Sequence, residues 1–205
     1  MRIGVIADTH CPEFLDELPP DVFESLRGVD LILHAGDVGG EGTLERLREL
    51  APVEAVRGDH DSDLRGLPRR RQLEVAGRRI AVIHGNRSHL VEEPVTLVAT
   101  LTLGRLWMRM GLGRWLRRQF PEADVIVYGH THRACLEAVG GALVFNPGAV
   151  YQVTSREARR RLDSRPNWFE WCWLQVIRHR RDRPVRSVGV LEIGDAVRAS
   201  VLPLG

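Results

Sequence analysis

Four short apolar runs along the chain each lead into a residue that can carry chemistry. Residues 2–7, 29–34, 80–83 and 125–128 are rich in Ile, Val, Leu and Ala. Apolar runs of this length are typical of strands that are buried on both faces. At or shortly after their ends come Asp8, Asp37, His84 and His130. The pattern therefore predicts four buried strands whose carboxyl ends present Asp or His.

Between these runs the hydrophobic spacing changes to that of a helix. Leu44, Leu47 and Leu50 recur at helical spacing within residues 43–50, and the first turn is acidic. Strands that alternate with helices indicate an α/β layered fold.

After residue 132 the pattern favours antiparallel strands. Residues 136–139 and 142–145 are joined by Gly140-Gly141, which is a hairpin signal, and two more strand-like runs cover 187–193 and 197–202. We find no internal repeat, low-complexity segment or Gly/Ser linker that would separate domains. We therefore expect one domain over residues 1–205.

Composition and charge narrow the class of protein. With 43% hydrophobic and 27% charged residues, the chain can bury a core, which excludes disorder. All 29 basic residues are Arg, and they nearly balance 27 acidic residues to leave a formal charge of +2, so charge alone does not indicate a dedicated nucleic-acid binder. The three cysteines form no CxxC pair, which favours a reducing compartment. With no signal-peptide core or membrane-length apolar run, we expect a cytoplasmic protein.

Asp and His gather in five clusters, four of them at predicted strand ends. Because loops at the carboxyl ends of an α/β sheet converge on one crevice, these clusters should meet in space. Their donors are nitrogen and carboxylate oxygen without thiolate, which suits Mn²⁺, Fe or Zn²⁺, and seven such ligands suffice for two ions. The clusters are Asp8-Thr9-His10, Gly36-Asp37, Gly58-Asp59-His60-Asp61, His84-Gly85 and Gly129-His130-Thr131-His132.

In order, spacing and residue types, these clusters resemble the signature of the calcineurin-like metallophosphoesterase superfamily: DxH, GD, GNH(D/E), GH, GHxH. Asn146-Pro147-Gly148 resembles the NPG turn of its small prokaryotic members. The resemblance covers most of residues 1–150 and the closing strands. It implies an α/β fold, a four-layer αββα sandwich with two mixed β-sheets, here with a helical insertion, and a dinuclear metal centre at one edge.

The resemblance also implies the ligand sets, with Asp37 bridging two divalent transition-metal ions. Manganese is favoured, and iron, zinc or nickel are alternatives. Such a centre hydrolyses a phosphodiester or phosphomonoester bond with a metal-activated water. Three further residues complete each set: Asp8, His10 and His132 for the first ion, and Asp59, His84 and His130 for the second.

His60 resembles the histidine of the GNH element, which stabilises charge on the phosphorane or protonates the leaving alkoxide. The alternative is that it only orients Asp37 or a phosphate. Where the family has Asn, this chain has Asp59, whose extra negative charge should hold metal more tightly and polarise phosphate less. Asp61 is expected to orient the loop and not to bind metal.

Two segments, at about 88–121 and 152–184, are longer than compact members of this family need. Residues 94–121 combine five arginines with many apolar side chains, which favours two short helices with a bend near 111. They either pack on the core or form a lid, a homodimer face or a surface for an acyl chain. In the second segment, Trp171 and Trp173 lie between basic runs and favour a packed strand, with single-stranded nucleic acid binding as the alternative.

The function expected from these residues is a dinuclear metal-dependent phosphoesterase, most simply a phosphodiesterase, acting on a phosphate-ester substrate. Two rivals are open: a non-catalytic metal-binding scaffold of the same fold, and a pyrophosphatase that acts on a lipid-linked nucleotide. Binding to nucleic acid or a membrane surface is possible but not favoured.

Overall fold

A computed structural model describes residues 1–87, 94, 97–98, 101–102, 111–179 and 184–205. By its internal contacts the chain divides into two compact units. The first unit comprises residues 1–85, 113–151 and 184–205, and the second comprises residues 86–112 and 152–183. The second unit therefore corresponds closely to the two long segments seen in the sequence, except that residues 113–121 belong to the first. The single-domain prediction stays a prediction.

The first sheet of the first unit has five strands in the order β10-β9-β1-β2-β3. Its strands are β1 (Arg2–Ile6), β2 (Leu31–His34), β3 (Val53–Ala55), β9 (Ser187–Ile193) and β10 (Val197–Pro203). The strands β1, β2 and β3 run parallel, and β9 pairs antiparallel with both β1 and β10. The predicted runs at 2–7, 29–34, 187–193 and 197–202 are confirmed as strands of this sheet.

The second sheet has the order β4-β5-β6-β8-β7. Its strands are β4 (Arg70–Val75), β5 (Arg78–Ile83), β6 (Val125–Val127), β7 (Cys135–Val139) and β8 (Ala142–Asn146). The predicted hairpin is confirmed as β7 and β8, but β8 also pairs parallel with β6, so the second half is not wholly antiparallel. Strands β3 and β4 escaped prediction because β3 has three residues and β4 alternates polar with partly buried positions at an edge.

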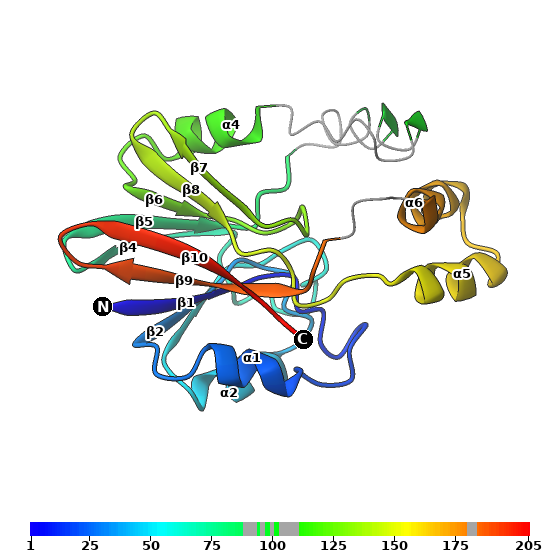
Figure 1. The fold of residues 1–205 in the computed structure, drawn as a ribbon, viewed down its shortest axis with the longest axis horizontal. Coiled ribbons are helices and arrows are strands. Elements are labelled where there is room, and N and C mark those ends of the chain that lie inside the picture. Colours follow the sequence, from blue (N-terminus) through cyan, green and yellow to red (C-terminus); the bar gives the residue numbers. More distant parts are fainter. Residues whose placement is uncertain (88–93, 95–96, 99–100, 103–110, 180–183) are drawn as a thin grey trace. The chain divides into compact units, whose positions relative to one another are not determined.

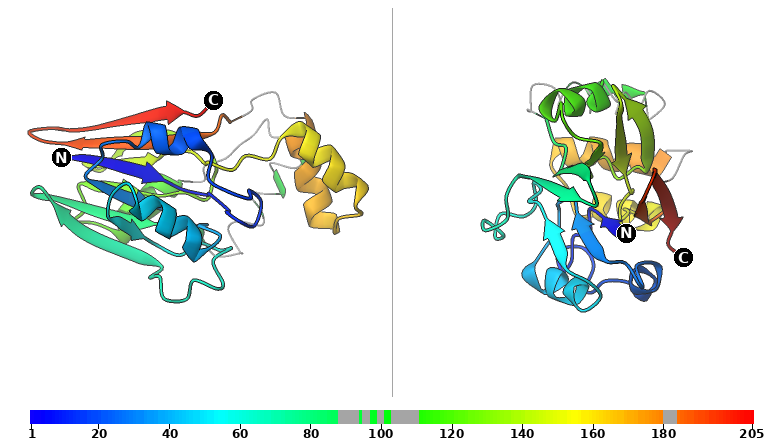
Figure 2. Two further views of the ribbon diagram at one scale, coloured as in Figure 1. Left: turned by 90° about the horizontal axis from the view of Figure 1, so that it is seen from below. Right: turned by 90° about the vertical axis from the view of Figure 1, so that its left-hand side faces the viewer.

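The two sheets pack face to face, with helices on both outer sides (Figure 1). Val5 and Leu33 of the first sheet belong to the same buried cluster as Val82 and Val127 of the second. On the outer side of the first sheet lie α1 (Pro20–Ser25) and α2 (Glu41–Arg48), as Figure 2 also shows. The helix α4 (Leu112–Gln119) covers the second sheet. The predicted four-layer αββα sandwich with two mixed sheets is confirmed.

The helix α4 shows that part of the 94–121 segment packs on the core, which is one of the alternatives given above. Leu112, Leu116 and Phe120 are buried at four-residue spacing, whereas Arg114 and Arg118 are exposed. Residues 112–120 therefore pack on the core with a solvated Arg face. Most of residues 94–110 lie outside the described part of the chain, so the bend near 111 and the lid, homodimer and acyl-chain roles stay predictions.

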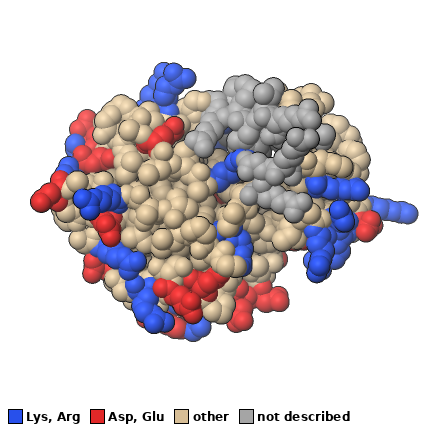
Figure 3. Space-filling view, in the orientation of Figure 1, with Lys and Arg blue, Asp and Glu red and all other residues tan. Residues whose placement is uncertain are grey.

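The second unit contains two described helices, α5 (Ser155–Asp163) and α6 (Trp168–His179). Within it, Arg161 of α5 pairs with Glu170 of α6 at 2.6 Å and lies over the Trp173 ring. Basic side chains gather over α5 in Figure 3. Arg159 and Arg160 of this helix are exposed. Nucleic-acid binding by this segment stays a prediction.

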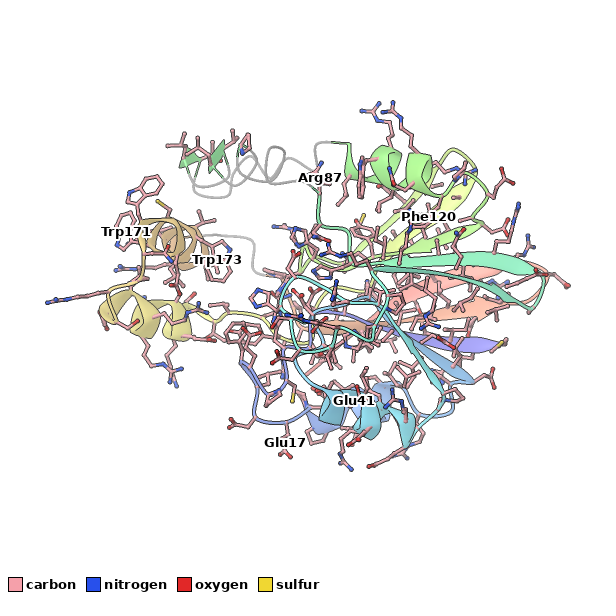
Figure 4. All side chains as sticks on the ribbon, turned by 180° about the vertical axis from the view of Figure 1, so that it is seen from behind. Glu17, Glu41, Arg87, Phe120, Trp171 and Trp173 are labelled. Atoms are coloured by element: carbon pink, nitrogen blue, oxygen red, sulfur yellow. The ribbon has the colours of Figure 1, made fainter. Side chains whose placement is uncertain are left out.

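The strand predicted around Trp171 and Trp173 is wrong, because both residues lie in α6. In a strand the two indoles would share a face, but in a helix residues two apart point to different sides. Trp171 is exposed and Trp173 is half-buried, on different sides of α6 (Figure 4). The six-residue aromatic run 168–173 is too short to distinguish the two-residue periodicity of a strand from the 3.6-residue periodicity of a helix. The available signal was Asn167, whose Oδ1 accepts a hydrogen bond from the backbone N–H of Glu170 at the helix start.

Along the part of the chain that the structure describes, no helix is both long and apolar enough to cross a bilayer.

Candidate metal centre

Loops from both sheets of the first unit bring the five clusters together. Asp8, Asp37 and Asp59 follow β1, β2 and β3, while His84 follows β5 and His130 follows β6. One hydrogen bond joins the loops across the sandwich, from the His130 N–H to the Asp8 carboxylate at 3.1 Å, and another joins two loops of the second sheet, from the Gly129 N–H to the His84 carbonyl at 3.0 Å. Strands that are far apart in sequence therefore deliver their last residues to one place.

The backbone at this place is unusual. Among the described residues, seven other than glycine have positive φ, and five of them are predicted ligands: Asp8, His10, Asp37, His130 and His132. Left-handed backbone costs on the order of 1 kcal/mol or more at a residue with a Cβ. Hydrogen bonds hold two of these residues in place, from the Asp8 N–H to the Gly36 carbonyl and from the His10 N–H to the Asp37 carbonyl, both at 3.0 Å. The strain turns successive side chains toward a common point.

Three predicted ligands form a first group: Asp8, His10 and His132. Their ligand atoms all lie within 4.8 Å of one another, and His132 Nε2 is 3.5 Å from Asp8 Oδ1. Asp8 and His10 are buried. Burial lowers the pKa of His10, and burial together with the neighbouring imidazoles lowers that of His132. Both rings are thereby kept in the neutral form that binds metal.

Three others form a second group: Asp59, His84 and His130. His130 Nδ1 lies 3.7 Å from Asp59 Oδ2. Only His84 is buried, whereas the Asp59 side chain is 46% exposed. The second group is therefore open to solvent.

Asp37 faces both groups with the same carboxylate oxygen. Its Oδ2 lies 3.5 Å from His10 Nε2 of the first group and 3.3 Å from His84 Nε2 of the second. Its Oδ1 accepts a hydrogen bond from the backbone N–H of His60 at 2.9 Å. Burial would raise the pKa of Asp37, but contact with His84 and the His60 amide hold it well below its ordinary value. The side chain is a carboxylate suited to bridge two cations.

The two ring nitrogens of His84 are arranged as in a metal-binding histidine. Its Nδ1 donates to the Ala35 carbonyl at 2.8 Å, and within the described chain its buried Nε2 makes no hydrogen bond. Metal-binding histidines are held in this way, with one ring nitrogen donating to a carbonyl and the other turned to the ion. Burial alone would lower the pKa of His84, but the adjacent Asp37 carboxylate raises it to about 10. In the metal-free protein a proton thus takes the place of a cation.

Asp8 is buried without enough positive charge or hydrogen bonding nearby to stabilise its ionised form fully. Burial raises the pKa of Asp8 to about 8, against the opposing charge of His84. Burial favours the protonated form of Asp8, and a cation bound beside it would stabilise the carboxylate instead. Together with the donor set of nitrogen and oxygen, this environment suits a divalent transition metal.

Two glycines in the motifs make room for these carboxylates. A Cβ at Gly58 would overlap Asp37 Oδ1, and one at Gly129 would come within 2.9 Å of Asp8 Oδ2. The Gly before Asp59 and the Gly before His130 are therefore required by close packing and not by loop flexibility.

Supporting side chains hold the loops. Asp61 is buried and accepts hydrogen bonds from the backbone N–H groups of Gly39 and Gly58, which confirms its predicted loop role. Asn146, of the NPG turn, donates to the Gly129 carbonyl at 2.7 Å and accepts from Gly148 N–H at 2.9 Å. It thereby fixes the turn that precedes His130.

His60 lies beside Asp37, and its side chain is 44% exposed. One group of possible ligand atoms also combines His60 with His10 and Asp37. The structure thus brings all eight predicted site residues to one edge of the sandwich. Their roles as metal ligands and as the catalytic histidine stay predictions.

Sequence reasoning missed one charged neighbour of the site. Glu13 contacts His10 and His60, and it lies three residues after His10 in a loop without regular periodicity. Its only sequence signal is that it is an acid close to the first cluster.

Comparisons with known proteins agree with this geometry. The profile of the calcineurin-like phosphoesterase superfamily domain matches residues 1–161. A probable metallophosphoesterase of Methanothermobacter thermautotrophicus is 37% identical over 151 residues, which are 73% of this chain and 77% of that protein. A phosphodiesterase of Methanocaldococcus jannaschii is 24% identical over 167 residues, with 72% of this chain and 83% of that protein covered.

Solved structures share the fold. The crystal structure of Vps29 from Entamoeba histolytica, complexed with Zn²⁺, matches with a TM-score of 0.64 at 23% identity and covers 99% of both chains. From the converging Asp and His clusters, the αββα sandwich and the match over residues 1–161, we conclude that the chain belongs to the calcineurin-like phosphoesterase superfamily of metal-dependent phosphoesterases.

Proposed function

We propose that this protein is a dinuclear metal-dependent phosphodiesterase. The observation that carries the proposal is the position of Asp37 Oδ2, which lies within 3.5 Å of His10 Nε2 and 3.3 Å of His84 Nε2. These two imidazoles belong to separate groups of ligands, so one carboxylate serves both. This arrangement supports two adjacent ion sites with Asp37 shared between them.

Divalent ions bound at these sites would supply Lewis acidity to the phosphoryl oxygens and lower the pKa of water. The chain's own residues position these ions and the substrate. Asp8 and Asp37 provide the buried negative charge, and the exposed edge near Asp59 admits a phosphate ester. His60 is placed to donate a proton to the leaving oxygen or to stabilise negative charge on the phosphoryl group.

The preference for diesters is the finer part of the proposal. It is supported by the relative named as a phosphodiesterase, which this chain matches over 72% of its length. It is also supported by the exposure of Asp59 and His60, at 46% and 44%, because a diester needs room for a second substituent.

The test is metal depletion followed by reconstitution. The purified protein is dialysed against a chelator, its metal content is measured, and Mn²⁺ is returned. Hydrolysis of bis(p-nitrophenyl) phosphate and of p-nitrophenyl phosphate is followed throughout. We expect two ions per chain, loss of turnover on chelation, recovery with Mn²⁺ and a faster reaction with the diester. Asp63→Asn, which alters an exposed carboxylate two residues after Asp61, is the matched control and should behave as wild type.

The outcomes separate the proposal from its rivals. Two bound ions without hydrolysis of either ester would favour the non-catalytic scaffold. Failure to bind any ion would overturn the proposed centre. Faster turnover of the monoester would retain the metal centre and reject the diester preference.

A further inference from the structure

One carboxylate lies between a predicted metal ligand and the predicted catalytic histidine. Glu13 Oε2 is 3.2 Å from His10 Nδ1, and Glu13 Oε1 is 3.0 Å from His60 Nδ1. Each oxygen thus contacts a different imidazole, and each contact is made at the Nδ1 atom. The two rings are themselves close, with centroids 4.7 Å apart in an edge-on arrangement.

We propose that Glu13 is a positioning residue that orients the imidazole of His60 for catalysis. By accepting a hydrogen bond from His60 Nδ1–H, it leaves Nε2 as the ring nitrogen available to the phosphoryl or leaving oxygen. The inference rests on the proposed function, since it adds a residue to that same reaction. It also explains why a partly exposed acid lies beside two site histidines.

The His60 ring packs edge-on against His10 and Phe14, and these contacts cover only part of it. Its backbone N–H is tied to Asp37 Oδ1 at 2.9 Å, which places the residue but not its ring. Its side chain is 44% exposed, so its χ angles are not fixed by packing alone. A hydrogen bond from Nδ1 to a carboxylate selects one ring orientation, as it does for histidines held by a second residue in other active sites.

The contact with His10 ties this orientation to the first metal group. His10 turns Nε2 toward Asp37 Oδ2 at 3.5 Å while Nδ1 faces Glu13. His10 is also buried, and its backbone N–H donates to the Asp37 carbonyl at 3.0 Å, so loss of Glu13 should leave His10 in place and release only the His60 ring. The single carboxylate fixes the distance between the His60 ring and the first group.

The proton balance of the reaction is simple. A water oxygen forms a bond to phosphorus as the bond from phosphorus to the leaving oxygen breaks. The leaving oxygen takes the proton from His60 Nε2, while Nδ1 keeps its proton toward Glu13. The proton lost by the attacking water passes to solvent, from which His60 recovers one.

The kinetic test compares leaving groups. Nitrophenolate leaves without needing a proton, whereas the alkoxide of a dinucleoside phosphate needs one. We expect Glu13→Ala to lower kcat for the dinucleoside phosphate by about 10- to 100-fold, the usual effect of removing an orienting partner. For bis(p-nitrophenyl) phosphate, kcat should fall less than about threefold. Glu13→Gln, which retains an oxygen acceptor, should recover part of the loss.

Two comparisons guard against a merely structural effect. Glu17→Ala removes an exposed acid of the same loop, labelled in Figure 4, and should leave both rates unchanged. In the double variant Glu13→Ala/His60→Ala, loss of Glu13 should add nothing to loss of His60. An equal effect on both substrates, or an additive effect in the double variant, would overturn the assignment.

A spectroscopic measurement tests the contact apart from turnover. In Zn²⁺-loaded protein labelled with ¹⁵N-histidine, we expect His60 to show a protonated Nδ1 with a downfield proton signal. Glu13→Ala should abolish that signal with zinc content unchanged, and Glu17→Ala should keep it. An unaltered signal in Glu13→Ala, or loss of zinc in that variant, would contradict the proposed role.

The kinetic and spectroscopic results can overturn the role of Glu13 and the proposed phosphodiesterase function independently of each other. If no ester is hydrolysed but the His60 signal depends on Glu13, the phosphodiesterase proposal fails and the contact stands without its catalytic use. If wild-type protein hydrolyses diesters and Glu13→Ala matches it on both substrates, the positioning role alone is overturned.

Discussion

The first and second ligand groups are similar in donor chemistry but differ in their exposure to water. In the first group, Asp8 is completely buried, and burial raises its pKa to about 8. In the second group, Asp59 has a side chain that is 46% exposed, although His84 is buried. In the first group, the negative charge of Asp8 is not stabilised by water or by the fold alone. In the second group, water already stabilises the negative charge of Asp59.

This difference teaches how one centre can combine retention with access. A desolvated carboxylate interacts strongly with a cation because water does not compete, whereas an exposed one is screened. We expect the first group to keep its ion and the second to exchange its ion and meet the substrate. Asp37 should contribute both to ion retention at the first group and to ion exchange at the second, because its carboxylate faces both groups.

The largest effect should come from Asp37, whose loss removes the distinction between the groups. Asp37→Asn should release both ions and lower kcat/KM by more than about 10³-fold, since metal ions supply several kcal/mol of transition-state stabilisation. Metal analysis and hydrolysis of bis(p-nitrophenyl) phosphate check this, with Asp63→Asn as the control. Retention of both ions would show that Asp37 is not their shared ligand.

His60 should separate chemistry from metal binding. His60→Ala is expected to lower kcat for a dinucleoside phosphate, whose leaving alkoxide needs a proton, by roughly 10² or more while both ions remain, because His60 acts in the transition state. His179→Ala changes an exposed histidine of α6 and serves as the matched control. Loss of an ion from the His60 variant would place this residue among the ligands instead, as its proximity to His10 and Asp37 permits.

The pH dependence of metal affinity should differ between the groups. The pKa of Asp8 is raised to about 8 by burial, and that of His84 is raised to about 10 by Asp37 despite burial. Both must lose a proton to bind metal, so affinity rises with pH, by about tenfold per unit for one released proton. Calorimetric titration with Mn²⁺ should show the first site levelling near pH 8, while the second continues to tighten. Equal pH dependence at the two sites would break the comparison.

Asp59 should give the smallest effect. Asp59→Asn removes one negative charge from the exposed group, which should weaken retention of the second ion by about tenfold or less, since exposed charges are screened. The higher net charge should make the reacting water more acidic and move the low-pH limb of the rate profile downward. Dialysis followed by metal analysis, with a pH–rate profile, measures both. An unchanged limb with full occupancy of both sites would mean that Asp59 is not a ligand.

The sequence predicted which side chains meet at this edge because these Asp and His residues come at or shortly after strand ends. A run such as Val125–Val127, buried on both faces, has a clear boundary at which the next polar residues must emerge. The same logic failed in the second unit, where the aromatic alternation at Trp171 and Trp173 suggested a strand and the structure has a helix. The residue types there are compatible with either a strand or a helix, and the hydrogen bond from the Glu170 N–H to Asn167 marks the start of the helix.

By itself, the sequence determined which donors are present and in which order they reach the edge of the sandwich. Apolar periodicity sets where each strand ends, and the residue types set the chemistry available there. Only the tertiary structure decided that Asp37 Oδ2 faces both His10 and His84, and that Glu13 reaches His60 across 47 residues. Such contacts depend on loop packing and on left-handed backbone at particular residues, and these arise from interactions between strands and not from any local pattern.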